Sequence, residues 1–151
     1  MDSIDNKILR LLQINAKQNV KEIANKVGLS VTPTYERIKK LEKQGVIKSY
    51  VALLNKDKID KQIIAYCQIT MLQHEKKLIS DFASKISAFS PVMECHHVSG
   101  NFDFLVKIVC NDMNDFYEFI NQKLSSVEGI STIHSSFEMN SFKDSTAYDL
   151  Y

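Results

Sequence analysis

The sequence predicts an α+β protein in which a small helical domain precedes a domain of alternating strands and helices. In residues 1–45, apolar side chains recur every three or four positions, as in helices that pack on one side. From residue 63 onward, short runs rich in β-branched and aromatic residues alternate with longer helical patterns. The charge also divides, which indicates two domains with different partners. Residues 1–50 hold ten Lys or Arg against five Asp or Glu, net +5, and the remainder holds nine against thirteen, net −4.

The overall composition is that of an ordinary globular protein. The chain has 151 residues, 44% of them hydrophobic and 25% charged. No apolar stretch approaches the roughly 18 residues that a membrane span needs, and the charged start has no signal-peptide core. We therefore expect a cytoplasmic protein with no membrane partner. Cys67, Cys95 and Cys110 are odd in number and far apart, which favours buried free thiols in a reducing cytosol.

Two helices are predicted at the start of the chain. Asp2 can cap the first helix, with Asp5 three residues on, and this helix is expected to end near Asn15. Its apolar positions are Ile4, Ile8, Leu11 and Leu12. Asn19 followed by Glu22 is a capping-box pattern that begins a second, short helix. Its buried face is predicted to hold Ile23, Ala24 and Val27.

A third helix follows a turn at Gly28, a residue that can end the second helix in the left-handed conformation. Thr32 is the predicted N-cap, Pro33 the first helical residue and Gly45 the terminator. Its apolar side is expected to hold Tyr35, Ile38 and Leu41, and its basic side Arg37, Lys40 and Lys43, with Thr34 and Lys39 nearby. Two helices joined by a short turn, the second of them basic, make a helix-turn-helix whose charge pattern favours DNA binding over a plain helical bundle.

The chain then changes to β-forming residues. The segment VIKSYVALLN, residues 46–55, predicts a strand leading out of the first domain, and residues 56–61 predict a polar linker. The remainder has the order strand, helix, strand, strand, helix, strand. The strands are predicted at 63–72, 91–99, 102–110 and 130–139, the helices at 75–89 and 113–127, and a tight turn at 100–101.

This order is that of a ferredoxin-like βαββαβ sandwich, with an antiparallel sheet and two helices on one face. The other face needs a cover, and we expect a second copy of the chain to dimerise sheet to sheet. The polar segment 140–151 is predicted to be a loosely ordered tail.

The run Glu94, Cys95, His96 and His97 has metal-binding residue types. In a strand, alternate residues face opposite sides, so Cys95 and His97 share one face and Glu94 and His96 the other. A zinc site needs its ligands on one side, so no metal and no cofactor are expected. The chain also has no nucleophile and base pattern, no phosphate loop and no recognisable paired acids, which argues against an enzyme.

Five stretches together resemble the Lrp/AsnC family of leucine-responsive or feast/famine regulators, over nearly the whole chain. They are DSIDNKILRLLQINA, VKEIANKVGLSVTPTYERIKKLEKQGVIKSYVALLN, ECHHVSGNFDFLVKIVCNDMNDFYEFI, VEGISTIHSSFEM and KDSTAYDL. The resemblance implies a cytoplasmic transcription regulator whose dimers assemble further, often into tetramers or octamers. It also implies a winged-helix-like DNA-binding domain at 1–48, a hinge strand and linker at 49–61, a ferredoxin-like effector and oligomerisation domain at 62–139, and a tail at 140–151.

The DNA-binding residues are expected around the third helix. The set is Ser30, Thr32, Thr34, Tyr35, Arg37, Lys39, Lys40 and Lys43. Arg37 is the best candidate for a bidentate base contact, because its planar fork matches guanine edges. Thr34 is expected to reach a base or a thymine methyl group, and the lysines to bind phosphates. The alternative for each lysine is a solvated position with no DNA contact. The alternative for Tyr35 is packing against the first helix.

The effector site is expected at the glycine turn, where the family binds a small molecule, usually an amino acid, between dimers. Glycine allows backbone N–H groups to approach a carboxylate, and Asp103 can accept an ammonium group. The predicted set is His97, Ser99, Gly100, Asn101, Asp103, Met113, Ser136, Phe137 and Glu138, the first and the last four by resemblance. A plain hairpin with Asp103 stabilising its own turn is the alternative. His97 stands where many relatives carry an aliphatic residue, which leaves the effector class open.

The leading hypothesis is thus a DNA-binding regulator modulated by an amino-acid effector. The alternative is an architectural protein that wraps or bends DNA with little effector response. Defined half-sites about one helical turn apart in a footprint favour the first, and extended uniform protection favours the second.

Overall fold

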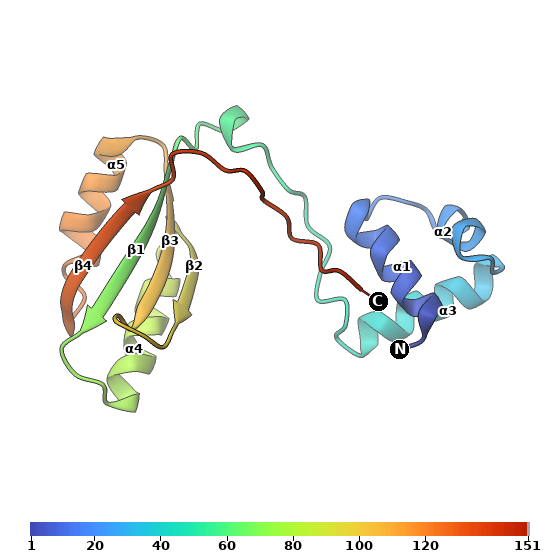
Figure 1. Cartoon of the computed structure of the whole chain (residues 1–151), viewed down its shortest axis with the longest axis horizontal. Coiled ribbons are helices and arrows are strands. Elements are labelled where there is room, and N and C mark those ends of the chain that lie inside the picture. Colours follow the sequence, from blue (N-terminus) through green and yellow to red (C-terminus); the bar gives the residue numbers. More distant parts are fainter. Residues whose placement is uncertain (151) are drawn as a thin grey trace. The chain divides into compact units, whose positions relative to one another are not determined.

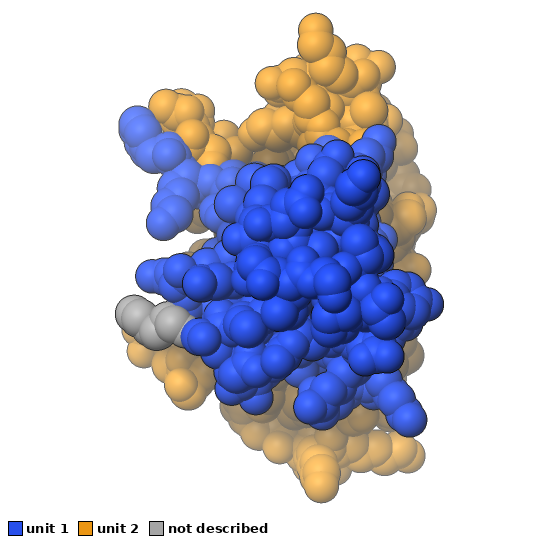
Figure 2. Space-filling model, turned by 90° about the vertical axis from the view of Figure 1, so that its right-hand side faces the viewer, with its two compact units in different colours: residues 1–53, 142–151 blue, residues 54–141 orange. Residues whose placement is uncertain are grey.

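The computed structural model describes residues 1–150, which form two compact units (Figure 2). The first unit comprises Met1–Leu53 and the segment from Phe142 onward, and the second comprises Leu54–Ser141. Of the tail predicted at 140–151, residues 142–150 therefore belong to the first unit. Within residues 1–150, every helix is too short or too polar to cross a membrane bilayer.

The first unit contains three helices, α1 (Ser3–Ile14), α2 (Val20–Val27) and α3 (Val31–Lys43), labelled in Figure 1. Both predicted caps are present as reciprocal capping boxes, Asp2 with Asp5 and Asn19 with Glu22. Gly28 has a φ of 75° at the end of α2, which confirms the predicted left-handed turn. Local chemistry therefore determines where α1 and α2 begin and where α2 ends.

The start of α3 differs from the prediction, because Ser30 and not Thr32 is its N-cap residue. The carbonyl of Ser30 accepts both the backbone N–H of Thr34 at 3.3 Å and the Thr34 hydroxyl at 2.9 Å. These bonds are those of a first helical turn that begins two residues earlier than predicted. Pro33 therefore lies inside the first turn, where its missing N–H is still tolerated.

The core of the first unit is a small apolar cluster between the three helices. Its buried members are Ile8, Leu9, Ile23, Val27, Ile38 and Leu41. The strand predicted at 46–55 does not form, and these residues have no β-ladder in the described chain. A strand requires a hydrogen-bonded neighbour, and the exposed side chains of Val51, Leu53 and Leu54 contribute little burial.

The second unit has the predicted order of elements. Its strands are β1 (Ile63–Met71), β2 (Val92–His97), β3 (Phe104–Cys110) and β4 (Ile130–Phe137), and its helices are α4 (Lys76–Ser87) and α5 (Met113–Glu118). The sheet order is β2-β3-β1-β4 and every pairing is antiparallel. This is the α+β ferredoxin-like arrangement, preceded by a short 3₁₀ turn at Lys56–Lys58.

The helix predicted at 113–127 changes its pitch halfway. After α5 the chain continues as a π-helix over Phe119–Leu124. Ser125 accounts for the wider turn, because its backbone N–H and its hydroxyl both donate to the carbonyl of Ile120, at 2.9 and 2.7 Å. An i to i+5 hydrogen bond is the defining bond of a π-helix.

One face of the sheet holds the core of the second unit, and both helices cover that face. The strands contribute Ala65, Cys67, Ile69, Met71, Phe104, Val106, Ile108 and Cys110, and the helical segments contribute Phe82, Ile86, Phe116, Phe119, Leu124 and Val127. Cys67 and Cys110 are buried and Cys95 is half-buried, and all three are free thiols. Residues of the opposite face, such as Tyr66, Gln68 and Lys107, are not covered by a helix of this unit.

Candidate DNA-binding and effector sites

The exposed face of α3 carries an aromatic ring and lysines. Thr32, Tyr35, Lys39 and Lys43 follow one another at steps of three or four, which places them along one side of the helix. Tyr35 is 49% exposed, so it does not belong to the buried apolar side of α3 where it was predicted. The Lys39 ammonium lies 5.7 Å from the centre of the Tyr35 ring and 2.8 Å from a carboxylate oxygen of Glu42. This face is a cationic surface with hydroxyl groups at its N-terminal end, where Ser30 and Thr32 are exposed.

Thr34 does not belong to this face. Its side chain is fully buried and its hydroxyl is engaged by the Ser30 carbonyl. Thr34, Ile38 and Leu41 are spaced by four and three, so a helix of 3.6 residues per turn directs them to one side, into the core. The prediction that Thr34 contacts a base is therefore wrong.

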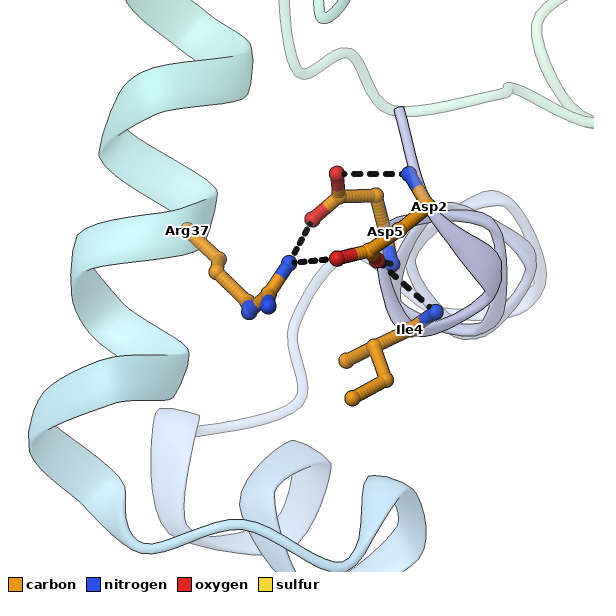
Figure 3. A network of polar contacts seen from close by, with 4 residues as sticks. All are labelled: Asp2, Ile4, Asp5 and Arg37. Atoms are coloured by element: carbon orange, nitrogen blue, oxygen red, sulfur yellow. Dashed lines mark hydrogen bonds and ion pairs between the residues drawn. The ribbon is translucent and has the colours of Figure 1, made fainter.

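Arg37 points toward α1 instead of outward (Figure 3). Its Nη1 donates to Asp2 Oδ2 and to Asp5 Oδ1, both at 2.7 Å. The two aspartates are the members of the α1 capping box, so each has one oxygen for the helix backbone and one for the guanidinium. This arrangement ties the middle of α3 to the first turn of α1, and it engages the side chain for which a base contact was predicted.

The charges of this network stabilise one another. The Asp5 backbone N–H, followed by the Arg37 guanidinium, holds the pKa of Asp2 below its usual value of 3.8. The hydrogen bonds to Asp5 and then to Asp2 raise the pKa of Arg37 above its usual value. Asp2 is therefore a carboxylate and Arg37 a cation at any pH near neutrality. The network lines an open hollow of about 590 Å³ between α1 and α3, together with Met1, Pro33, Glu36 and Lys40.

In the second unit, the glycine turn between β2 and β3 is tied to the end of β1 by Asp103. Its Oδ2 accepts the backbone N–H of Met71 at 2.7 Å, and its Oδ1 lies 2.9 Å from Nε2 of His74. The Asp103 backbone N–H also donates to the carbonyl of Ile69 at 2.9 Å. The predicted residues Ser99, Gly100 and Asn101 are exposed at the tip of this turn, and Gly100 has a φ of 134°.

The other predicted effector residues lie at the opposite end of the sheet. Phe137 pairs with Ala65 in β1, whereas the residue beside Asp103, Phe104, pairs with Ile69. Four residues of β1 separate these positions, a distance of about 13 Å at ~3.3 Å per residue. Figure 1 shows the β2–β3 turn and the end of β4 at opposite ends of the sheet. One chain therefore does not bring the two groups together.

The second group has its own contacts. The Phe137 ring packs edge to face against Phe116 of α5, with centroids 5.0 Å apart. Glu138 forms an ion pair with Lys56 at 2.8 Å. Met113 and Ser136 are exposed. These side chains line the end of the sheet where β4 finishes and α5 begins.

The run from Glu94 to His97 divides between the two faces of the sheet, as predicted. His97 stacks on the buried ring of Phe104, with centroids 5.1 Å apart, and Cys95 packs against the core. Glu94 instead contacts His96 at 3.2 Å and Lys107 at 3.3 Å. Within residues 1–150, no three His, Cys, Asp or Glu side chains are grouped so that they could hold a metal ion.

Three partner residues in these sites, Asp2, Asp5 and His74, were not predicted from the sequence. Asp2 and Asp5 were recognised as a cap. Their contact with Arg37 was not predicted, because 35 residues separate Asp2 from Arg37 and no local pattern links them. Two carboxylates in one capping box are the only local hint, because a cap uses just one oxygen of each. His74 lies in a loop after β1, and no sequence pattern links it to Asp103.

Comparison with known proteins accounts for both units. Residues 1–48 match the winged helix-turn-helix DNA-binding family, and residues 64–148 match the Lrp/AsnC ligand binding domain. The leucine-responsive regulatory protein of Haemophilus influenzae is 38% identical over 143 residues, which cover 95% of this chain and 86% of that protein. The chain belongs to the Lrp/AsnC family. The DNA-binding match lies in the first unit, and most of the ligand-binding match lies in the second.

Solved structures of Lrp/AsnC regulators have the same fold. An AsnC family transcriptional regulator from Agrobacterium tumefaciens is 34% identical, with a TM-score of 0.94 over 99% of this chain and 97% of that one. A transcriptional regulator from Neisseria meningitidis, solved in complex with L-Met, is 30% identical, with a TM-score of 0.94 over 99% of this chain and 96% of that one. Both similarities extend over the two units and the tail.

Proposed function

We propose that this Lrp/AsnC regulator binds double-stranded DNA through α3, and that an amino acid bound between subunits modulates its assembly and its DNA binding. It acts in the cytoplasm, by binding rather than by catalysis. The observation that carries the proposal is the exposed face of α3, where Tyr35, Lys39 and Lys43 lie on the second helix of a helix-turn-helix.

The residues of α3 divide into three roles. Lys39, Lys40 and Lys43 are exposed and bind phosphates, which gives affinity without sequence information. Ser30, Thr32 and Tyr35 are exposed toward the N-terminal half of the helix and contact base edges. Arg37 positions α3 on α1 through its two carboxylates, so a direct base contact would require it to leave both.

Salt dependence tests the phosphate role. Loss of one phosphate contact lowers the slope of log affinity against log salt by about 0.9. Lys43→Ala should show this change and weaken binding similarly on every DNA sequence. Lys21→Ala removes an exposed lysine from α2 and serves as the matched control. A Lys43→Ala slope equal to that of Lys21→Ala would remove Lys43 from the DNA interface.

The effector site is proposed to form between two subunits. One subunit supplies the turn His97 to Asp103, and the other supplies Met113 and the residues Ser136 to Glu138, because these groups lie about 13 Å apart within one sheet. An ionised carboxylate has about four acceptor positions. Asp103 can therefore accept an α-ammonium group while it holds Met71 and faces His74, and the turn backbone can hold the α-carboxylate.

Isothermal titration across the amino acids tests this site, beginning with L-methionine because a relative 30% identical was solved with it. Asp103→Ala should abolish binding. Asp81→Ala, an exposed aspartate of α4, should bind as well as the unmodified chain. The effector assignment fails if no amino acid binds, or if Asp103→Ala binds equally well while circular dichroism shows it folded.

Assembly follows from the uncovered sheet face and the divided effector site. Dimers would form sheet to sheet, and dimers would join into tetramers or octamers around the bound amino acid. Light scattering with and without the amino acid found by titration measures both. A monomer at micromolar concentration under all conditions would contradict the proposal.

A further inference from the structure

The segment at the end of the described chain lies on α1 and is held there by one side-chain amide. The Tyr148 backbone N–H donates to Gln13 Oε1 at 2.7 Å, and Gln13 Nε2 donates to the Tyr148 carbonyl at 3.0 Å. A side-chain amide that pairs with both backbone groups of one residue reproduces the exchange of an antiparallel ladder. Gln13 bonds only the backbone groups of Tyr148, and the Tyr148 side chain remains 81% exposed.

Neighbouring residues add contacts on both sides. Leu150 packs against the apolar cluster of the first unit, and an Asp149 carboxylate oxygen lies 3.8 Å from the Arg10 guanidinium. Arg10 and Gln13 are three residues apart on α1, so both face the same way. Just N-terminal to the docked residues, the Ser145 hydroxyl accepts the Ala147 N–H at 3.2 Å and forms a local turn. Polar side chains of α1 and the apolar cluster of the first unit thus both contact this one extended segment.

The docking is weak enough to be reversible. Arg10 and Asp149 are 49% and 81% exposed, and ion pairs between exposed groups contribute little. Both Gln13 hydrogen bonds are also exposed to competing water. A single half-buried leucine supplies the apolar part.

The position of the segment in the chain gives this docking a consequence. The chain leaves the first unit at Leu53 and returns to it at Phe142, so the segment is a second covalent connection between the ligand-binding and DNA-binding units. It holds α1, and the first turn of α1 holds α3 through Arg37. A change in the docked segment therefore acts on the helix that positions α3.

We propose that Ala147–Leu150 is a latch that docks on Arg10 and Gln13 of its own chain, stiffens α1 when docked and loosens it when released. The proposal does not depend on which DNA or which effector the protein binds. It assigns to α1 a recognition site for an extended segment with an acidic residue followed by leucine.

Site-resolved hydrogen exchange of the full chain tests the latch. A docked Tyr148 amide should exchange more slowly than a free peptide amide, by about tenfold or more, since opening must precede exchange. Gln13→Met keeps the approximate size of the side chain but removes both the acceptor of the Tyr148 N–H and the donor to the Tyr148 carbonyl. This variant should lose the protection of Tyr148 and show faster exchange along α1. Lys7→Ala removes an exposed side chain from the same helix and should change neither.

Leu150→Ser is the second variant, because it cannot disturb α1 except through docking. It should also release Tyr148 and speed exchange in α1. The latch is overturned if the Tyr148 amide exchanges at the free rate in the unmodified chain, or if both variants keep its protection. Protection that disappears on dilution would show docking on a second copy, and this too would overturn docking within one chain.

Discussion

Each unit places a carboxylate on a backbone N–H at the end of an element, but the charged partners of the two carboxylates differ. Asp2 caps α1 while 52% exposed and pairs with Arg37, a permanent cation. Asp103 caps the end of β1 while 15% exposed and pairs with the imidazole of His74. The first network joins two helices of a small domain. The second fixes a turn against a large core.

The apolar cores of the two units also differ in size. The apolar cluster of the first unit has six buried members among the described residues, whereas that of the second has fourteen. Small domains bury a smaller fraction of their surface and are correspondingly marginal. Polar contacts such as those of Arg37 and Gln13 therefore contribute a larger fraction of the stabilisation of the first unit. The DNA-binding unit is the part that a modest change can loosen.

The largest expected effect comes from a core truncation. Leu41→Ala should cost about 2–5 kcal/mol, because it leaves a cavity in the small cluster. The first unit should then unfold at a lower temperature while the second remains folded, which circular dichroism and hydrogen exchange can separate. Ile108→Ala is the counterpart in the large core and should lower the transition of the second unit. Both units melting together in both variants would contradict the division.

A smaller loss is expected at the glycine turn. Asp103→Leu removes the acceptor of the Met71 N–H and the partner of His74 at once, at a cost of about 1–3 kcal/mol. Asp103→Asn retains an acceptor oxygen for Met71 and should recover part of that loss. Thermal unfolding of the second unit measures the two variants. Equal stability of Asp103→Leu and the unmodified chain would show that the turn holds without this side chain.

Substitutions in the Arg37 network are expected to change DNA affinity rather than the stability of an apolar core. As a positioning residue, Arg37 should weaken binding to all sequences when changed to Gln, while the salt slope falls by clearly less than the ~0.9 expected for a lost phosphate contact. Asp5→Asn should act in the same direction, because it removes the other half of the network. Titration of DNA at several salt concentrations measures both. Relaxed preference at one base position in Arg37→Gln alone would instead assign Arg37 to the bases.

The caps of α1 and α2 and the end of α2 were predictable from the sequence, because their causes are local. Asn19 and Glu22 are three residues apart, and Gly28 ends α2 through its own backbone. The order of strands and helices in the second unit followed from the change of apolar period. The positive φ of 72° at Gly45 likewise agrees with its predicted place at the end of α3.

The site residues were less predictable. Their faces were assigned by steps of three residues, but an α-helix has 3.6 residues per turn, so such positions drift around the helix. That step grouped Tyr35 with Ile38 and Leu41, but the helix directs Thr34 inward and Tyr35 outward. The partners of Arg37 and Asp103 come from distant segments, so only the folded chain reveals them. The predicted effector residues are divided between two ends of the sheet for the same reason, since nearness in a family pattern is not nearness within one subunit.

The smallest expected effect concerns the segment that follows α3. The Tyr50 hydroxyl donates to Glu42 Oε1 at 3.0 Å, and partial burial together with this bond raises the pKa of Tyr50 to about 12. The stabilisation requires the neutral phenol, so it is complete below the ordinary value of 10 and is lost as the pH rises through about 12. Absorbance at alkaline pH should show a tyrosine ionising at about pH 12.

Tyr50→Phe is the control for this titration. It should remove the late step and make the stability of the first unit less dependent on pH between about 10 and 12. Titration of every tyrosine near 10 in the unmodified chain would show that Tyr50 is not held by Glu42. The Tyr50–Glu42 bond would then contribute nothing to the stability of the first unit.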